Sequence, residues 1–141
     1  MWTYIWPVLL ILGSNIAYNL MTKSTPAQVN PFASLTVTYL VAAVFSFILL
    51  LFSSSGHPMA DFREVNWTGI VLGMAIVGLE LGYICLYRAG WNISVGSLVA
   101  NVLLAACLLV IGLVVFKEAV GVKQMLGIAV CLCGLVLINM K

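Results

Sequence analysis

The chain has 141 residues, of which 64% are hydrophobic and only 7% are charged. Because soluble domains carry about a quarter charged residues, this composition excludes a soluble globular protein and predicts an integral membrane protein. The net charge of +2 is too small to suggest a nucleic-acid partner. The four cysteines lie in apolar segments without metal-ligand spacing, so we interpret them as packing residues and expect no metal site and no cofactor.

Five apolar segments are long enough to cross a bilayer, whose hydrocarbon core of about 30 Å requires roughly 20 helical residues. The segments are continuously apolar, which excludes the alternating pattern of a membrane β-barrel. We therefore predict an all-α, polytopic membrane protein in which residues 1–141 form a single transmembrane domain. The predicted spans are residues 2–21, 31–52, 67–88, 95–116 and 124–140.

The break between the third and fourth spans, AGWNIS, is short. Asn92 and Ser94 are residue types that start helices, which favours two separate spans. The alternative is that this break packs inside the membrane and turns the two spans into a re-entrant pair. We expect a multi-pass protein of the cell membrane, the inner membrane of a bacterium or archaeon.

The basic residues are balanced across the predicted membrane. One side carries Arg63, Lys117 and Lys123, and the other carries Lys23, Arg88 and Lys141. An excess of Lys and Arg on the cytoplasmic side normally sets the orientation, and no excess exists here. The balance predicts a dual-topology protein that inserts both ways and forms an antiparallel homodimer. The alternative is that local charges or a partner subunit fix one orientation.

Glu80 is the only formally charged residue in the apolar run GIVLGMAIVGLELGYICLY of the third span. A charged group at this depth costs on the order of a few kcal/mol, so such residues usually face a helix-bundle interior or a water-filled path. Apolar surroundings favour the protonated carboxyl group, for which a proton and a cationic or polar substrate would compete. We predict that Glu80 is a proton or cation site. The alternative is a protonated group that joins two helices through hydrogen bonds.

Residues three and four positions apart share a helix face, which places Tyr83 and Tyr87 beside Glu80. Tyrosine hydroxyls can hydrogen-bond the carboxyl group or a ligand, and the rings can hold a cation. Tyr83 is the stronger candidate, because Tyr87 lies near the span end, where aromatic residues often act as interface anchors.

Polar residues also share faces on two other spans. Asn15 and Asn19 are four positions apart on the first span, as are Ser97 and Asn101 on the fourth. Polar side chains in a membrane need partners, so we expect both faces to point inward. They either line a cavity together with Glu80 or join helices.

Small residues follow the spacing that lets membrane helices approach closely. We expect them to pack helices and, on the fifth span, to contact a second copy. The positions concerned are Gly73, Gly78 and Gly82 on the third span and Gly127 and Gly134 on the fifth.

The order and spacing of several motifs resemble a known family. The sequence LGSNIAY from Leu12 and the turn through Pro26 and Pro31 resemble the opening of EamA domains, which belong to the drug/metabolite transporter superfamily. The stretch from Leu86 to Asn139, which includes a Lys117–Glu118 turn, resembles the C-terminal half of that domain. The resemblance implies one five-helix EamA-like repeat.

Typical members of that family carry two such repeats, inverted relative to each other, whereas one repeat would pair with another to enclose a central path. The related small multidrug resistance proteins pair as antiparallel dimers and place an essential Glu in the first helix. Here Glu80 lies in the third span, so their mechanism cannot be transferred residue by residue.

The resemblance implies a transporter of small polar or cationic solutes. We expect a proton-coupled exporter, an antiporter that works by alternating access as an antiparallel homodimer. Its partners would be the lipid bilayer, the small-molecule substrate and protons. The alternatives are an accessory subunit of another transporter and a flippase of a lipid-linked substrate. An enzyme is not expected, because no Ser/His/Asp set, metal cluster or phosphate loop is present.

Overall fold

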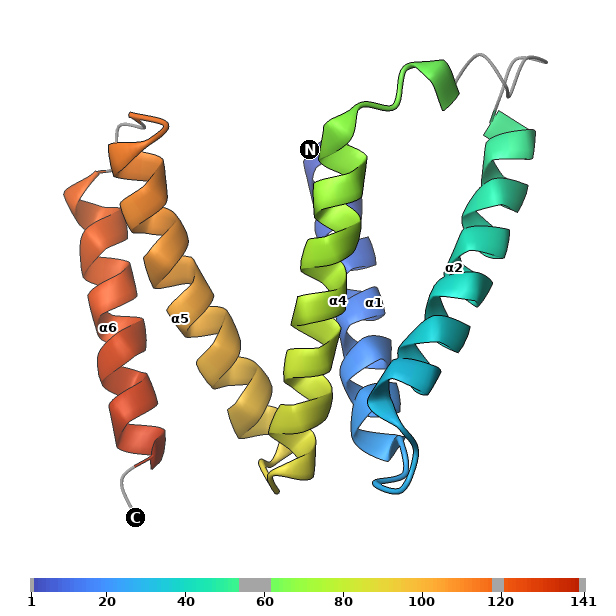
Figure 1. The fold of residues 1–141 in the computed structure, drawn as a ribbon. Coiled ribbons are helices and arrows are strands. Elements are labelled where there is room, and N and C mark those ends of the chain that lie inside the picture. The colour runs from blue at the N-terminus through green and yellow to red at the C-terminus, as the bar shows by residue number, and fades with distance from the viewer. Residues whose placement is uncertain (1, 54–61, 118–120, 140–141) are drawn as a thin grey trace. The chain divides into compact units, whose positions relative to one another are not determined.

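The computed structural model describes residues 2–53, 62–117 and 121–139. Within these ranges all regular elements of the chain are helices and no strand occurs, which confirms the all-α prediction. The helices are α1 (Trp2–Ser24), α2 (Pro31–Ser53), α4 (Trp67–Arg88), α5 (Ile93–Val114) and α6 (Val122–Asn139), as Figure 1 shows.

Four of the helices, α1, α2, α4 and α5, are long and apolar enough to cross a membrane. The fifth, α6, is apolar but shorter. All observed bounds lie within three residues of the predicted spans. Met140 and Glu118, which belong to the predicted fifth span and to the turn before it, lie outside the described residues.

The largest difference from the predicted bounds is at the end of α1, which continues through Lys23 to Ser24 instead of ending at Met21. The last carbonyl groups of a helix have no partner within it. Here the Thr25 hydroxyl donates a hydrogen bond of 3.1 Å to the Met21 carbonyl oxygen. This contact gives one of the last carbonyl groups of α1 a partner, so that the helix can end in polar residues.

The chain divides into two compact units, and each is described by itself. The first unit is Met1–Leu20 with Gly90–Lys141, and the second is Met21–Ala89. In the first unit α5 packs against α6, and in the second α2 packs against α4.

Helices α2 and α4 run antiparallel in the second unit (Figure 1). The buried apolar residues of the described chain are Leu35 on α2 and Ile84 and Tyr87 on α4. The Arg88 guanidinium donates hydrogen bonds to two carbonyl oxygens of the turn between α1 and α2, at 2.5 Å to Val29 and 3.3 Å to Pro26. The end of α4 is thereby held to that turn.

Side-chain and backbone groups set the starts of α4 and α5. The Asn66 side chain accepts a hydrogen bond of 3.0 Å from the Thr68 backbone N–H, which caps α4. Asn92 precedes α5 as expected, although its side chain makes no capping bond. Instead the Asn92 carbonyl accepts a hydrogen bond of 2.8 Å from the Gly96 N–H.

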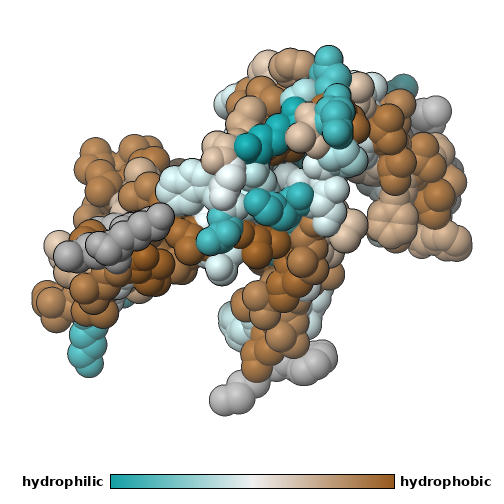
Figure 2. All heavy atoms as spheres, turned by 90° about the horizontal axis from the view of Figure 1, so that it is seen from below, coloured by the Kyte–Doolittle hydropathy of each residue, from teal (hydrophilic) through white to brown (hydrophobic). Residues whose placement is uncertain are grey.

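Apolar side chains cover the sides of the helices in both units, in brown in Figure 2. A methyl group added at any of the small-residue positions would meet no atom within 4 Å. No part of the described chain therefore packs closely on these glycines, so their role in helix packing and the contact of the fifth span with a second copy both stay predictions. The positions are Gly73, Gly78, Gly82, Gly127 and Gly134.

Candidate functional site

A cleft of about 610 Å³ lies between α1 and α5 in the first unit. Its apolar lining consists of Val8, Ile11, Leu12, Ile16, Leu20, Ile93 and Leu98. Its polar lining consists of Asn15, Asn19, Ser94, Ser97 and Asn101. This lining offers amide and hydroxyl groups but, in this part of the described chain, no charged side chain.

On α1 the polar lining is built from the Asn15–Asn19 pair. Asn19 is buried, with 6% of its surface exposed. Its Nδ2 group donates to the Asn15 carbonyl oxygen at 2.8 Å and to the Asn15 Oδ1 atom at 2.5 Å. Because residues four apart lie above one another on a helix, the two amides form one polar strip along the cleft.

On α5 the equivalent pair is Ser97 and Asn101. The Asn101 Nδ2 group donates to the Ser97 carbonyl oxygen at 2.8 Å and to the Ser97 Oγ atom at 3.2 Å. Only the NH₂ end of an amide can donate to a carbonyl, so these contacts determine which way the amide faces. The Asn101 carboxamide oxygen is left as a hydrogen-bond acceptor on an exposed residue of the cleft.

The structure thus brings together four residues that the sequence placed on inward faces: Asn15, Asn19, Ser97 and Asn101. Sequence reasoning did not select Ser94 as a lining residue. The available signal is its position one turn before Ser97 on the same helix, whereas the sequence pattern indicates Ser94 only as a helix start. Binding of a solute by these side chains stays a prediction.

Glu80 lies in the second unit, on α4, and is half-buried. One turn further along α4, Ile84 is 6% exposed, and on α2 Leu35 is 4% exposed. Both residues belong to the helices that pack against each other in the second unit. Glu80 shares the helix face of Ile84, one turn earlier on α4.

Tyr39 of α2 is the neighbour of Glu80 that sequence reasoning missed. The carboxylate of Glu80 lies within electrostatic range of the Tyr39 hydroxyl group. Helix α2 is mostly apolar and its polar groups are few, so its sequence does not indicate clearly which face meets α4. The single available signal was that Tyr39 is one of the few residues of α2 with a polar group.

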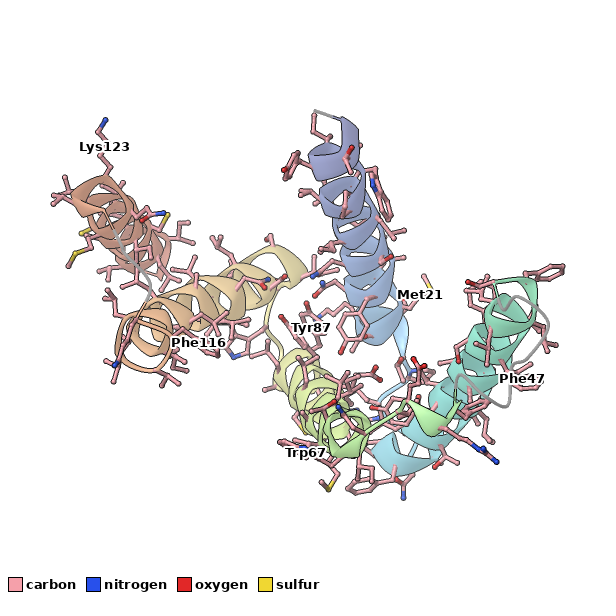
Figure 3. All side chains as sticks on the ribbon, turned by 90° about the horizontal axis from the view of Figure 1, so that it is seen from above. Met21, Phe47, Trp67, Tyr87, Phe116 and Lys123 are labelled. Atoms are coloured by element: carbon pink, nitrogen blue, oxygen red, sulfur yellow. The ribbon has the colours of Figure 1, made fainter. Side chains whose placement is uncertain are left out.

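Tyr83 and Tyr87 share the Glu80 side of α4, with ring centroids 6.0 Å apart and planes tilted by 38°. Tyr87 is 5% exposed and labelled at the end of α4 in Figure 3. The Lys23 Nζ atom lies 5.5 Å from the centre of the Tyr87 ring, which is cation–π distance. The Tyr87 ring therefore holds a cation of this chain, and a role in binding a substrate cation stays a prediction.

Long apolar helices, four of them of membrane-spanning length, with a cleft of amide and hydroxyl groups define a polytopic helical membrane protein. The model of the EamA-like transporter family matches residues 5–140. The chain belongs to the EamA-like transporter family, which confirms the resemblance seen in its motifs. Membership identifies a membrane transporter of the drug/metabolite transporter superfamily, a group of transporters and not of enzymes. Comparisons with curated proteins and with solved structures gave no match.

Proposed function

We propose that this protein exports a small polar or cationic solute in exchange for protons, with the α1–α5 cleft as part of the solute path. The observation that carries the proposal is the polar strip on helices that are otherwise apolar. Amides and hydroxyls inside a membrane need hydrogen-bond partners. A solute with hydroxyl, amide or amine groups would exchange water for these side chains as it enters, while its apolar parts contact the leucine and isoleucine lining.

Glu80 is the proposed proton site of the exchange. Its carboxyl group is half-buried at a helix contact, on a span with no other acid among its residues. When Glu80 is protonated, its carboxyl group is neutral. When the proton leaves, the negatively charged carboxylate can attract a polar or cationic group. Competition of the proton and the solute, combined with alternate exposure of the site to the two sides, would couple export to the proton gradient.

The proposed assembly is an antiparallel homodimer in the cell membrane. Support comes from the equal number of basic residues on the two sides, three and three. Further support comes from the exposed apolar helix sides, which another subunit or lipid must cover. The same exposed surfaces also suit an accessory subunit that completes another transporter, which is the second candidate function.

The test measures transport by the purified chain in proteoliposomes under an imposed pH gradient. The probes are radiolabelled amines, amino-acid amides and sugars, and the first transported compound becomes the substrate for all variants. We expect Glu80→Gln, which keeps the size and removes the titration, to abolish the pH dependence of transport while the dimer stays folded. Glu64→Gln, which removes an exposed acid before α4, is the matched control and should behave as the wild type.

Two outcomes would contradict the proposal. Full transport rate and unchanged pH response in Glu80→Gln would remove Glu80 from the coupling. Absence of transport by the purified wild-type chain, restored by adding a second membrane protein, would favour the accessory subunit.

A further inference from the structure

The hydroxyl group of Tyr39 on α2 is buried. Its oxygen atom is inaccessible to solvent and has no hydrogen-bond partner among the described residues. A buried tyrosine normally finds a partner for its O–H group, because an unpaired hydroxyl in apolar surroundings costs on the order of 2 kcal/mol or more. Within a membrane, water does not supply that partner. A group on a neighbouring helix has to provide it.

The register of the two antiparallel helices places Glu80 at the height of Tyr39. Leu35 is the fifth residue of α2 and Ile84 is the fifth from the end of α4, and both are buried on helices that run antiparallel and pack against each other (Figure 1). Tyr39 and Glu80 each lie four residues further into their helix, which is about 6 Å of helix rise. Four residues also return the side chain to nearly the same face.

Electrostatics agrees with this register. The Glu80 carboxylate lies close enough to the Tyr39 hydroxyl group to act on it electrostatically. The direct packing of α2 on α4 supplies the short path between them. The shared level on two packed helices is what a hydrogen bond between the two side chains requires.

We infer that Tyr39 is a positioning residue for Glu80, whose O–H group donates a hydrogen bond to a Glu80 carboxyl oxygen. The bond is available in both protonation states, because a carboxylic acid keeps one acceptor oxygen after it binds a proton. It orients the carboxyl group at the α2–α4 interface and supplies the partner that the Tyr39 hydroxyl lacks. The role of this bond in transport rests on the proposed function of Glu80, whereas the bond itself does not.

Infrared difference spectroscopy of the full chain in proteoliposomes tests the bond without a transport assay. The C=O stretching band of protonated Glu80 is assigned by its loss in Glu80→Gln. We expect Tyr39→Phe to move this band to higher wavenumber, because the carbonyl oxygen loses a donor. Tyr4→Phe, which removes a hydroxyl from a residue that is 84% exposed, should leave the band in place. The carboxylate bands give the same comparison for the ionised state.

An unchanged Glu80 band in Tyr39→Phe would overturn the inference. The substitution keeps the ring and therefore the packing, and circular dichroism verifies that the helices are retained. If Glu80→Gln transports normally but Tyr39→Phe shifts the band, the proposed coupling fails and the contact stands. If both contact and coupling hold, Tyr39→Phe alters the pH profile of transport in the wild type and has no further effect in Glu80→Gln.

Discussion

Asparagine side chains on two apolar helices of this protein form hydrogen bonds within their own helix. Asn19 and Asn101 both direct the amide NH₂ group to the carbonyl oxygen four residues earlier, at 2.8 Å in each case. The amide NH₂ group of each asparagine therefore has a hydrogen-bond acceptor within the same helix. A polar face whose amide donors are satisfied in this way can line an open cleft, which is what the proposed solute path requires.

Asn101 provides the sharpest test of the cleft at this scale. Asn101→Ala removes the exposed carboxamide, and the KM for the transported probe should rise about two- to tenfold, the ratio that corresponds to one hydrogen bond worth about 0.5–1.5 kcal/mol. The maximal rate and the pH dependence should change little, because Glu80 is intact. Ser46→Ala is the control, since that hydroxyl donates to the Ala43 carbonyl of α2 and lies outside the cleft. An unchanged KM in Asn101→Ala, measured by initial rates, would exclude this residue from solute binding.

At the scale of helices, hydropathy predicted the elements well because each span is continuously apolar and ends at polar or turn-forming residues. Because the spans are so uniformly apolar, hydropathy did not predict which helix faces pack against each other. The Glu80 face of α4 was visible because Tyr83 and Tyr87 mark it, whereas α2 has no such stripe. Tyr39 was therefore invisible as a partner of Glu80. The register that pairs them depends on which apolar faces interlock, and composition does not encode that choice.

The turn between α4 and α5 depends on Gly90, whose φ of +93° is unfavourable for residues with a side chain. A Cβ atom there would meet no neighbour, so Gly90→Ala tests the backbone alone. We expect it to lower the free energy of unfolding by about 1 kcal/mol or more. Gly78→Ala is the comparison, because alanine in the middle of a helix gains about 0.5–1 kcal/mol over glycine where space is open.

Unfolding by denaturing detergent, followed by circular dichroism, measures both variants. A Gly90→Ala protein as stable as the wild type would contradict the turn geometry. If Gly78→Ala keeps the helix content but weakens dimer formation, the open glycine face of α4 contacts a second copy. That result would support the packing role predicted for the small residues of the third span.

At the scale of the whole molecule, few side chains are buried and most apolar ones are exposed. In a membrane there is no strong hydrophobic force between helices, so lipid can cover such surfaces, but a polar path must be enclosed by protein. A second copy in the opposite orientation would present the same faces upside down, as inverted repeats do in many transporters. The balance of basic residues across the predicted membrane is the feature of the chain that would permit both orientations.

Single charge changes should therefore bias the insertion in opposite directions. Lys123→Gln leaves two basic residues on its side of the predicted membrane against three, and Lys141→Gln does the reverse. Because the side richer in Lys and Arg remains cytoplasmic, each variant should insert mainly one way, and the two ways should differ. Accessibility of a cysteine added at either terminus, labelled from each side in a variant without the native cysteines, measures the orientation.

Transport then separates an antiparallel dimer from a parallel one. Either variant expressed alone should lose most activity, since its copies share one orientation. Expression of both together should restore transport, because an up-oriented copy then meets a down-oriented one. For an antiparallel dimer we expect both results: labelling of the wild type from both sides, and rescue of transport by co-expression of the two variants. A wild-type chain labelled from one side only, with full activity in both single variants, would rule out the antiparallel pair and leave a parallel dimer or a different partner subunit to enclose the cleft.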